Sequence, residues 1–440
     1  MEWFIAIHAV IHARISHQGA SLPQFARLAG SCLRILFIHQ NFPAQYLHLA
    51  RALVARGDQV AAIGGPTARA LPRVSLHRYD PCPPAGIPPC HPWAGDFQTK
   101  ILRAEAVCAT LERLIASDFR PDLIVGHPGW GELLGVKDLL PDVPVLHQVE
   151  FVYRLDGADL GFDPEFLTPD WRSRTRLRLR RASQLLAFHD LDWGMSPTAW
   201  QASTAPAEFR QRISVIHEGI DTDRIAPRAN CTVKLQRAGL AFRAGDEVVS
   251  FVARNLEPYR GFHRFMRMLP RFQQLRPQAH VLIVGGDGVS YGAAPPEGGT
   301  WKAQLLRELE GQLDLSRIHF VGRVSHSVLH DLFRVVACHV YLTYPFVLSW
   351  SVLEAMACGS VLVASATPPV EEVIQHGENG ILVDFFDGDE LAQRVAAVLA
   401  DPAAFRPLAE NARQTVVDAF DLNRYCLPRQ LALVDRLVFG

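Results

Sequence analysis

One carboxylate stands in a strongly apolar stretch of the chain, YPFVLSWSVLEAMACG, which runs from Tyr344 to Gly359. Glu354 follows Ser351 by three residues, and this spacing fits a capping box, in which the glutamate bonds only the first amides of its own helix. A carboxylate on the first turn after a strand also faces the carboxyl edge of a sheet, where ribose hydroxyls can donate to it. The residues alone leave both interpretations of Glu354 open.

Two arginines form a second group of residues that could bind a ligand. The stretch FVARNLEPYRGF, from Phe251 to Phe262, places Arg254, Arg260 and a glycine between a strand and a helical stretch. Free amides and the positive dipole end at such a turn, together with two guanidinium groups, suit a diphosphate. The alternative is that both arginines only solvate a loop.

A second glycine turn occurs in HVLIVGGDGVSYG, from His280 to Gly292. It resembles a nucleotide-binding turn but lacks the full GxGxxG spacing. A tight turn that needs a positive φ at Gly285 or Gly286 explains the same residues equally well.

In the first half of the chain, polar side chains follow predicted strands. His127 comes after the buried run DLIVG, titrates near neutral pH and can exchange a hydrogen bond with a reacting sugar, although a capping or core-edge role is the alternative. Asn41, Glu150 and Tyr153 follow two other predicted strands. We expect these side chains to line one edge of a sheet.

The elements that must position these residues form two series. Short β-branched and leucine-rich runs alternate with helical stretches, which indicates buried parallel strands joined by crossover helices. The first series contains LRILFIH, VAAIGG, DLIVGH, VPVLHQ and ISVIHEG, and the second EVVSFVAR, HVLIVGG, IHFVG, CHVYLTY, VLVAS and GILVD. The predicted fold class is therefore α/β, with two doubly wound Rossmann-like domains and the active site in a central cleft between them.

The turn-rich segment from Glu218 to Thr232 separates the two series, so we place the domain boundary near Ala226. The expected domains are residues 32–225 and 226–420. A C-terminal helix over residues 421–440 is expected to pack back on the first domain. Residues 1–31 precede the first convincing strand and are expected to form an N-terminal extension.

Composition narrows the class of protein. The chain has 440 residues, 49% of them hydrophobic, with a net charge of −1, so no global field would recruit nucleic acid. Eight cysteines without a CxxC pair indicate a reducing cytoplasm and no zinc site. The apolar runs are shorter than the roughly 18 residues of a membrane span.

The strongest local charge run is WRSRTRLRLRRASQLLAF, with six arginines between Arg172 and Arg181. In a helix, Arg172, Arg176 and Arg180 would share one face. A solvated helix face is the first interpretation. Contact with a phosphorylated acceptor or an anionic lipid surface is the alternative, which would place the protein at the inner face of a membrane as a peripheral protein.

Taken together, four segments resemble the family 4 glycosyltransferases with the GT-B fold. In chain order they are VIHEGIDTDRIAP, FVARNLEPYRGF, FVGRVSHSVLHDLF and the long segment that begins at YPFVLSWSVLEAMACG. The first half, with FIHQNFPAQY, GHPGWGE and GFDPEF, resembles one bacterial branch of that family, marked by HQNFP and PFVLSWS-type motifs.

The resemblance implies transfer of a sugar from a nucleotide diphosphate donor with retention at the anomeric carbon. In the family, the pair matching Arg254 and Arg260 holds the diphosphate, and the histidine matching His127 lies beside the donor sugar. These three residues are the expected catalytic set. The resemblance assigns Glu354 to the ribose of the donor, and Gly322 and Val324 to the wall near the base. It also assigns donor binding to Ser349, Trp350 and Leu353.

The chain departs from the family pattern at two points. Many members have a glutamate eight residues before the one that binds ribose, whereas this chain has Phe346. The basic pair is one residue further apart than the common Arg-x4-Lys spacing, and Arg260 replaces the lysine. The donor sugar therefore stays open, and we expect a reshaped but cationic phosphate clamp.

The expected reaction needs no metal and no cofactor. The triplet from Asp221 to Asp223 matches a family segment without metal, and the acceptor is expected to attack from the front face without a covalent protein intermediate. The expected acceptor is a glycan, a lipid-linked molecule or a small molecule, and Asn41, Glu150 and Tyr153 are expected on the acceptor side of the site. Two alternatives remain: a nucleotide-sugar epimerase of the same fold and a non-catalytic nucleotide-sugar binding protein.

Overall fold

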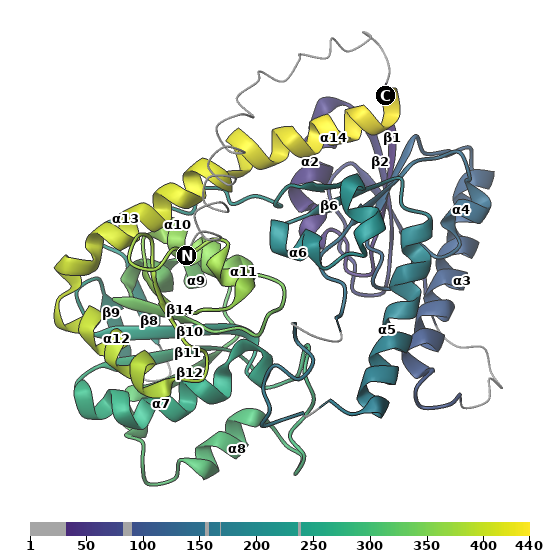
Figure 1. Cartoon of the computed structure of the whole chain (residues 1–440). Helices are drawn as coiled ribbons and strands as arrows, with labels where there is room; N and C mark the ends of the chain where they lie inside the picture. Colours follow the sequence, from purple (N-terminus) through teal and green to yellow (C-terminus); the bar gives the residue numbers. More distant parts are fainter. Residues whose placement is uncertain (1–31, 82–89, 155–157, 168, 236–238) are drawn as a thin grey trace, which may run out of the picture. The chain divides into compact units, whose positions relative to one another are not determined.

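The computed structural model describes residues 32–81, 90–154, 158–167, 169–235 and 239–440. The expected N-terminal extension lies outside the described residues. The chain from Arg34 to Gly440 forms one compact unit that contains two large parallel sheets and one small hairpin. Figure 1 shows both large sheets with helices beside them.

The first sheet has seven parallel strands in the order β3-β2-β1-β4-β5-β6-β7. Its strands are β1 (Arg34–Ile38), β2 (Gln59–Gly64), β3 (Val74–Arg78), β4 (Leu123–Gly126), β5 (Val145–Gln148), β6 (Trp193–Ser196) and β7 (Ile213–Val215). The central strands β1 and β4 are almost wholly buried, as expected for a parallel sheet covered on both faces.

The second sheet has six parallel strands in the order β12-β11-β10-β13-β14-β15. Its strands are β10 (Val248–Asn255), β11 (His280–Gly286), β12 (Ile318–Gly322), β13 (Cys338–Tyr341), β14 (Val361–Ser365) and β15 (Ile381–Val383). An antiparallel hairpin, β8 (Thr232–Leu235) with β9 (Leu240–Arg243), precedes it. Two doubly wound Rossmann-like sheets are thus confirmed.

Helices follow the strands in the crossover pattern that parallel pairing requires. Those of the first sheet are α2 (Leu47–Arg56), α3 (Gly95–Ala116), α4 (Val136–Leu139), α5 (Trp171–His189) and α6 (Ala199–Ser203). Those of the second are α7 (Phe262–Leu275), α8 (Trp301–Glu308), α9 (His326–Val335), α10 (Trp350–Cys358), α11 (Pro368–Glu371), α12 (Gly388–Ala400) and α13 (Pro402–Ala419).

The last helix, α14 (Leu427–Phe439), contacts α2 of the first sheet (Figure 1). Asp435 accepts a hydrogen bond from Arg56 at 2.7 Å, and the Arg436 guanidinium lies 4.0 Å from the Trp193 ring centroid. The Gln430 side chain donates to the backbone carbonyl of His217 at 2.8 Å. The C-terminal helix therefore ties the end of the chain to the first domain.

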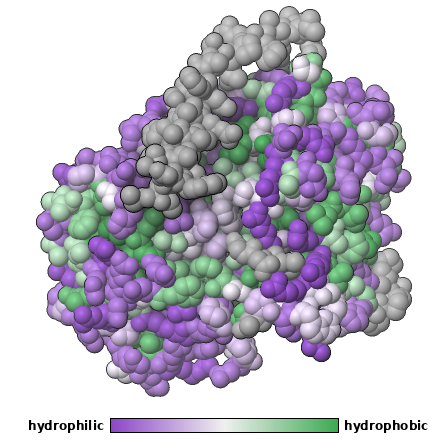
Figure 2. All heavy atoms as spheres, in the orientation of Figure 1, coloured by the Kyte–Doolittle hydropathy of each residue, from purple (hydrophilic) through white to green (hydrophobic). Residues whose placement is uncertain are grey.

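Hydrophilic residues predominate on the face drawn in Figure 2, with hydrophobic residues interspersed. Within the described ranges, every helix is too short or too polar to cross a membrane.

Candidate functional site

His127 and Glu150 form a pair at the carboxyl ends of neighbouring strands. His127 follows β4 directly, and Glu150 follows β5 by two residues. The amide of Gly129 donates to His127 Nδ1 at 2.9 Å, so the neutral ring carries its proton on Nε2. His127 Nε2 lies 3.4 Å from Glu150 Oε2. The local turn thus fixes a tautomer whose N–H faces a carboxylate.

The charge of Glu150 depends on both halves of the chain. Burial alone would raise the pKa of Glu150, but the contact with His127, together with smaller influences of His39 and Arg254, outweighs burial and lowers its pKa. Arg254 belongs to the second sheet, whereas the two histidines follow strands of the first. The site therefore contains a carboxylate held ionised by residues from two sheets.

Asn41 and Tyr153 lie on either side of this pair in the sequence. The amide of Asn41 donates to His39 Nδ1 at 3.1 Å, and the His39 and His127 ring centroids are 6.2 Å apart. Tyr153 lies under the Arg180 guanidinium, 4.1 Å from it, and burial raises the pKa of Tyr153 to about 12. Asn41 is thus linked to His127 through His39, and Tyr153 borders the arginines of α5.

Arg254 and Arg260 differ in their freedom to bind a ligand. Arg254 is the penultimate residue of β10, with an exposed side chain that makes no hydrogen bond to another described residue. Arg260 is buried, and its Nη1 donates to Tyr341 Oη, to Thr343 Oγ1 and to the carbonyl of Val347. Of these two arginines, Arg254 therefore has its whole guanidinium free of hydrogen bonds within the described chain. Arg260 has only Nη2 and Nε unbonded there.

The glycine turn after β11 is not a free phosphate cradle. The buried carboxylate of Glu257 accepts hydrogen bonds from the amides of Ser290, Tyr291 and Gly292 at 2.9–3.3 Å. The expected positive φ at Gly285 or Gly286 is also wrong, because both lie outside the positive-φ glycines. A Cβ at Gly285 would instead lie 2.8 Å from the Ala253 carbonyl oxygen. Close packing explains this glycine.

Glu354 is not part of the predicted capping box. Helix α10 begins at Trp350 and its N-cap is Ser349, whose hydroxyl accepts from the Ser351 amide at 3.4 Å. Glu354 is one turn further along, buried, with Oε1 lying 3.3 Å from His330 Nε2. Burial would raise its pKa, but hydrogen bonds from His326 and His330 outweigh burial and lower it to about 2. The Glu354 carboxylate is therefore ionised and directed toward the two histidines of α9, not toward the first amides of α10.

The other residues assigned to donor binding range from partly exposed to fully buried. Gly322 ends β12 with a φ of 74°, and Val324 is half-buried against the core beneath α9 and α10. Trp350 is partly exposed, with its Nε1 donating to Glu218 Oε2 at 3.3 Å. Leu353 is fully buried in that core, so its side chain has no surface to offer a ligand.

The position of Leu353 gives a first prediction. Leu353→Ala is expected to destabilise the protein by about 2–5 kcal/mol, because it leaves a cavity in a close-packed core. Denaturant unfolding measures this loss. At 25 °C the folded variant is expected to bind nucleotide as tightly as the wild type, and a selective loss of nucleotide affinity without a loss of stability would contradict the core assignment.

Phe346 occupies an aromatic cluster that joins the two halves of the chain. The interlobe aromatic cluster consists of Phe151, Tyr153, Trp200, Tyr259, Tyr291 and Phe346. Phe346 is only 4% exposed, and its ring centroid lies 4.8 Å from those of Phe151 and Tyr291. The Arg260 guanidinium lies 5.6 Å from the Phe346 ring. The Phe346 ring therefore lies beside Arg260, where many family members have a carboxylate.

Glu218 links the same two halves through polar contacts. Its Oε1 accepts from Gln148 of β5 at 2.7 Å, and its Oε2 accepts from Trp350 of α10. His217 Nε2 lies 3.5 Å from Oε2. Burial, followed by repulsion from the charge of Glu150, raises the pKa of Glu218 to about 8.

This shift predicts a pH-dependent effect of Glu218→Gln. An unfolded glutamate has a pKa of about 4.3, so between that pH and about 8 the folded protein holds a proton that the unfolded chain releases. The contribution of Glu218 to stability is present below that window and is lost as pH rises through it. The melting temperature of the variant, relative to the wild type, should therefore rise from pH 5 to pH 8. A constant difference would contradict the raised pKa.

Several neighbours of the predicted residues were missed by sequence reasoning. His39 and Glu132 lie in the quoted motifs FIHQNFP and GHPGWGE, and both are buried. Burial raises the pKa of Glu132 to about 7, although the hydrogen bond from Tyr79 opposes the rise. The H-x3-H spacing of His326 and His330 was visible in FVGRVSHSVLHDLF, where it predicts two imidazoles on one helix face.

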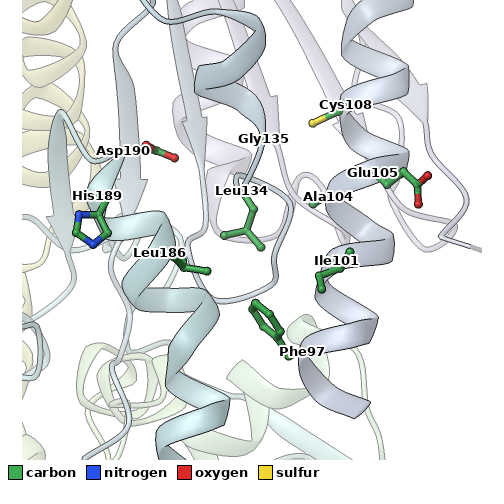
Figure 3. A pocket seen from close by; sticks show the side chains of 10 residues that line it. All are labelled: Phe97, Ile101, Ala104, Glu105, Cys108, Leu134, Gly135, Leu186, His189 and Asp190. Atoms are coloured by element: carbon green, nitrogen blue, oxygen red, sulfur yellow. The ribbon is translucent and has the colours of Figure 1, made fainter. Parts of the chain in front are cut away.

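An apolar hollow lies elsewhere, between α3 and α5 (Figure 3). Phe97, Ile101 and Cys108 line it from α3, and Leu186 lines it from α5. None of the predicted site residues borders it. The chemistry-bearing residues are therefore at the strand ends and not in this hollow.

Two family profiles match the chain. The profile described as Glycosyl transferase family 4 group matches residues 56–225, and the one described as Glycosyl transferases group 1 matches residues 233–415. The two matched segments together cover most of the chain: the first contains β2 to β7 of the first sheet, and the second contains all strands of the second sheet.

Curated relatives align with part of the chain. A D-inositol 3-phosphate glycosyltransferase from Kribbella flavida is 27% identical over 264 residues, which are 59% of this chain and 58% of the relative. The protein of that name from Mycolicibacterium vanbaalenii is 31% identical over 225 residues, 50% of this chain and 44% of the relative. The chain spans about half the length of the curated relatives it matches.

Solved structures match over nearly the whole chain. Sucrose-phosphate synthase from Thermosynechococcus elongatus has a TM-score of 0.67 and 20% identity, covering 92% of this chain and 99% of that one. The Anabaena protein HepE, in complex with UDP-glucose, has a TM-score of 0.63 and 19% identity, covering 91% and 99%. These likenesses show the fold.

Proposed function

Because the chain belongs to the family 4 glycosyltransferases and has their GT-B fold, we propose that it moves a sugar from a nucleotide diphosphate donor to an acceptor. The named relatives are glycosyltransferases, and a structural neighbour was solved with UDP-glucose. UDP-sugars are therefore the first donors to test.

One observation carries the proposal. Phe151, the residue after Glu150, packs on Phe346 with ring centroids 4.8 Å apart, and the Arg260 guanidinium lies 5.6 Å from that Phe346 ring. Arg254, near the end of β10, also contributes to lowering the pKa of Glu150, so the arginine pair lies near the His127–Glu150 pair of the other sheet. A diphosphate needs a cation, and a reacting sugar needs hydrogen-bonding groups. Here the arginine cation and the hydrogen-bonding groups of His127 and Glu150 are close enough to interact electrostatically. This supports a donor bound across the two sheets.

In the proposed mechanism, departure of the nucleoside diphosphate builds negative charge on the phosphates and positive character on the sugar ring. Arg254, together with the unbonded nitrogens of Arg260, stabilises the departing phosphates. The Nε2 proton of His127, which faces Glu150 in the free protein, is donated to the donor sugar when the donor binds, and Glu150 stays beside it. The acceptor attacks from the front face and its proton passes to the leaving phosphate, without metal and without a covalent protein intermediate.

The remaining residues hold the two substrates. Glu354 accepts hydrogen bonds from the ribose, and Gly322, Val324, Ser349 and Trp350 border the nucleoside. Asn41, Glu150 and Tyr153 are assigned to the acceptor side. The exposed arginines of α5 favour a phosphorylated acceptor or a lipid-linked one at a membrane surface, and co-sedimentation with anionic vesicles distinguishes the two.

The test is turnover of UDP-glucose in the presence of EDTA, with a panel of acceptors that includes D-inositol 3-phosphate. The expected result is UDP release that depends on one acceptor, and a product with the anomeric configuration of the donor. Isomerisation of the nucleotide sugar without acceptor would establish the epimerase instead. Nucleotide-sugar binding without turnover on any donor and acceptor pair would favour a binding protein.

A further inference from the structure

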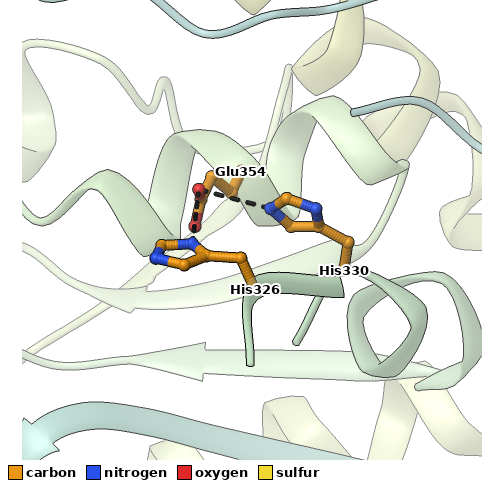
Figure 4. A group of neighbouring side chains, drawn as sticks. All are labelled: His326, His330 and Glu354. Atoms are coloured by element: carbon orange, nitrogen blue, oxygen red, sulfur yellow. Dashed lines mark hydrogen bonds and ion pairs between the residues drawn. The ribbon is translucent and has the colours of Figure 1, made fainter. Parts of the chain in front are cut away.

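Three metal-ligating side chains meet between α9 and α10. His326 is the first residue of α9 and His330 lies one turn later on the same face. Figure 4 shows both imidazoles directed toward the Glu354 carboxylate. Glu354 Oε1 lies 3.3 Å from His330 Nε2 and 3.8 Å from His326 Nδ1. All three ligand atoms lie within 4.8 Å of one another.

We propose that His326, His330 and Glu354 bind a divalent transition-metal ion of the zinc class. Zinc takes imidazole nitrogen and carboxylate oxygen at about 2.0–2.2 Å in a tetrahedral arrangement, which separates neighbouring ligand atoms by roughly 3.3 Å. The His330–Glu354 distance already has this value, the His326–Glu354 distance exceeds it by about half an ångström, and all three ligand atoms lie within 4.8 Å of one another. Movement of the exposed His326 ring would bring the third ligand atom into place. Solvent reaches His326, so water supplies the fourth ligand. Magnesium and calcium prefer oxygen ligands and do not suit two imidazoles.

The charge around Glu354 also favours a cation. Among the described residues, Glu354 forms ion pairs only with the two histidines, and no arginine or lysine neutralises it. A buried carboxylate without a fixed positive partner is costly unless a cation or protonated ligand pairs with it. A divalent metal bound to the two imidazole nitrogens and the carboxylate would supply this positive charge.

A second cluster, with two carboxylates and one histidine, serves as the contrast. Asp163, Glu165 and His263 also bring three ligand atoms together. There, however, Arg264 pairs with Asp163 at 3.2 Å and Arg267 pairs with Glu165 at 2.6 Å. Two arginines already neutralise its carboxylates, so we assign that cluster to structural ion pairs and expect it to leave metal unbound.

The experiment is a Co²⁺ titration of the untagged, chelator-treated full chain at pH 7.5, followed by the visible ligand-field absorption of tetrahedral Co²⁺. The wild type is expected to show this absorption at one metal per chain. The double variant His326→Ala with His330→Ala should weaken Co²⁺ binding by more than about tenfold, because loss even of second-shell partners costs about 10–100-fold. The matched control Glu165→Gln should bind as the wild type does.

Two results would overturn the metal site. One is a wild-type spectrum that lacks tetrahedral Co²⁺ absorption, and the other is an equal spectrum from the folded double variant. Circular dichroism confirms that the double variant is folded. The single variant His326→Ala, at an exposed position, provides a second test that folding does not confound, and an unchanged Co²⁺ affinity in it would exclude His326 as a ligand.

A consequence for the transferase rests on the proposed function. If Glu354 also grips the ribose, bound metal and nucleotide compete for one carboxylate, and Zn²⁺ inhibits the enzyme. Saturating UDP is therefore expected to remove the Co²⁺ absorption. Retention of the absorption in saturating UDP would contradict the ribose assignment of Glu354 while the metal site, tested by the histidine variants, would stand.

Discussion

Glu354→Gln is expected to raise the Kd for UDP by about a hundredfold. A hydrogen bond to a charged group contributes about 1.5–3 kcal/mol, and we assign this carboxylate to the ribose hydroxyls. Its pKa of about 2 means that Glu354 is ionised throughout the physiological range, so the charge-assisted bonds are fully present at pH 7.5. Isothermal titration calorimetry at 25 °C gives the two dissociation constants.

The ribose can be altered as well as the protein, which separates binding from folding. The wild type should bind 2′-deoxy-UDP about ten- to a hundredfold more weakly than UDP, the effect of one lost charge-assisted bond. In Glu354→Gln this preference should largely vanish, because the partner of the hydroxyl has lost its charge. A variant that keeps the full preference for UDP would contradict the ribose assignment, whatever its stability.

Arg254→Ala is expected to lower kcat for sugar transfer by about a hundredfold, since removal of one preorganised donor to a developing negative charge costs about 10²–10³ in rate. A loss of rate can be separated from a loss of stability, because Arg254 is exposed and makes no hydrogen bond within the described chain, so folding does not depend on it. The Kd for UDP should rise together with the loss in rate. The melting temperature without nucleotide should stay within about one degree, as for a surface change worth less than ~0.5 kcal/mol.

Arg243→Ala is the matched control for Arg254. Arg243 is also exposed and ends a strand, β9, but it lies in the hairpin outside the large sheet. It should leave both nucleotide affinity and rate unchanged. Equal effects of the two substitutions would show that only general charge attraction acts, and the phosphate assignment of Arg254 would then fail.

The second sheet could be predicted almost completely from the sequence because its strands are buried on both faces. All six runs of the second series became strands, and each is rich in β-branched or leucine residues. In the first sheet, β3 and β6 were missed. β3 (VSLHR) lies at the sheet edge and alternates with exposed residues, and β6 (WGMS) contains glycine and serine instead of a branched run. The hairpin β8–β9 was missed because two short strands outside the main sheet leave little signal.

The candidate site was less predictable than the fold. Sequence spacing identified His127, Glu150 and Arg254 as strand-end residues, but their mutual influence depends on how two sheets pack, which spacing does not encode. The capping box at Ser351 was wrong because the helix begins two residues earlier than that cap would place it, at Trp350 with Ser349 as its cap. That shift of two residues in the cap turns Glu354 toward α9 and its histidines.

The burial of Leu353 and the partners of Arg260 also needed the structure. The family resemblance assigned both residues to the donor site, and residue type alone does not distinguish a core leucine from one at a pocket wall. For Arg260, the decisive partners Tyr341, Thr343 and Val347 lie more than 80 positions away in the chain.

The central claim is that a nucleotide diphosphate binds at Arg254 and Glu354, and a thermal-shift screen tests it most directly. UDP, GDP, ADP and dTDP are compared, with Mg²⁺ and with EDTA, on the wild type, Arg254→Ala and Glu354→Gln. A ligand that binds only the native state at a hundred times its Kd adds about 2.7 kcal/mol. We predict that UDP stabilises the wild type equally with and without Mg²⁺ and stabilises both variants far less. Stabilisation by none of the four nucleotides, or equal stabilisation of all three proteins, would contradict the account.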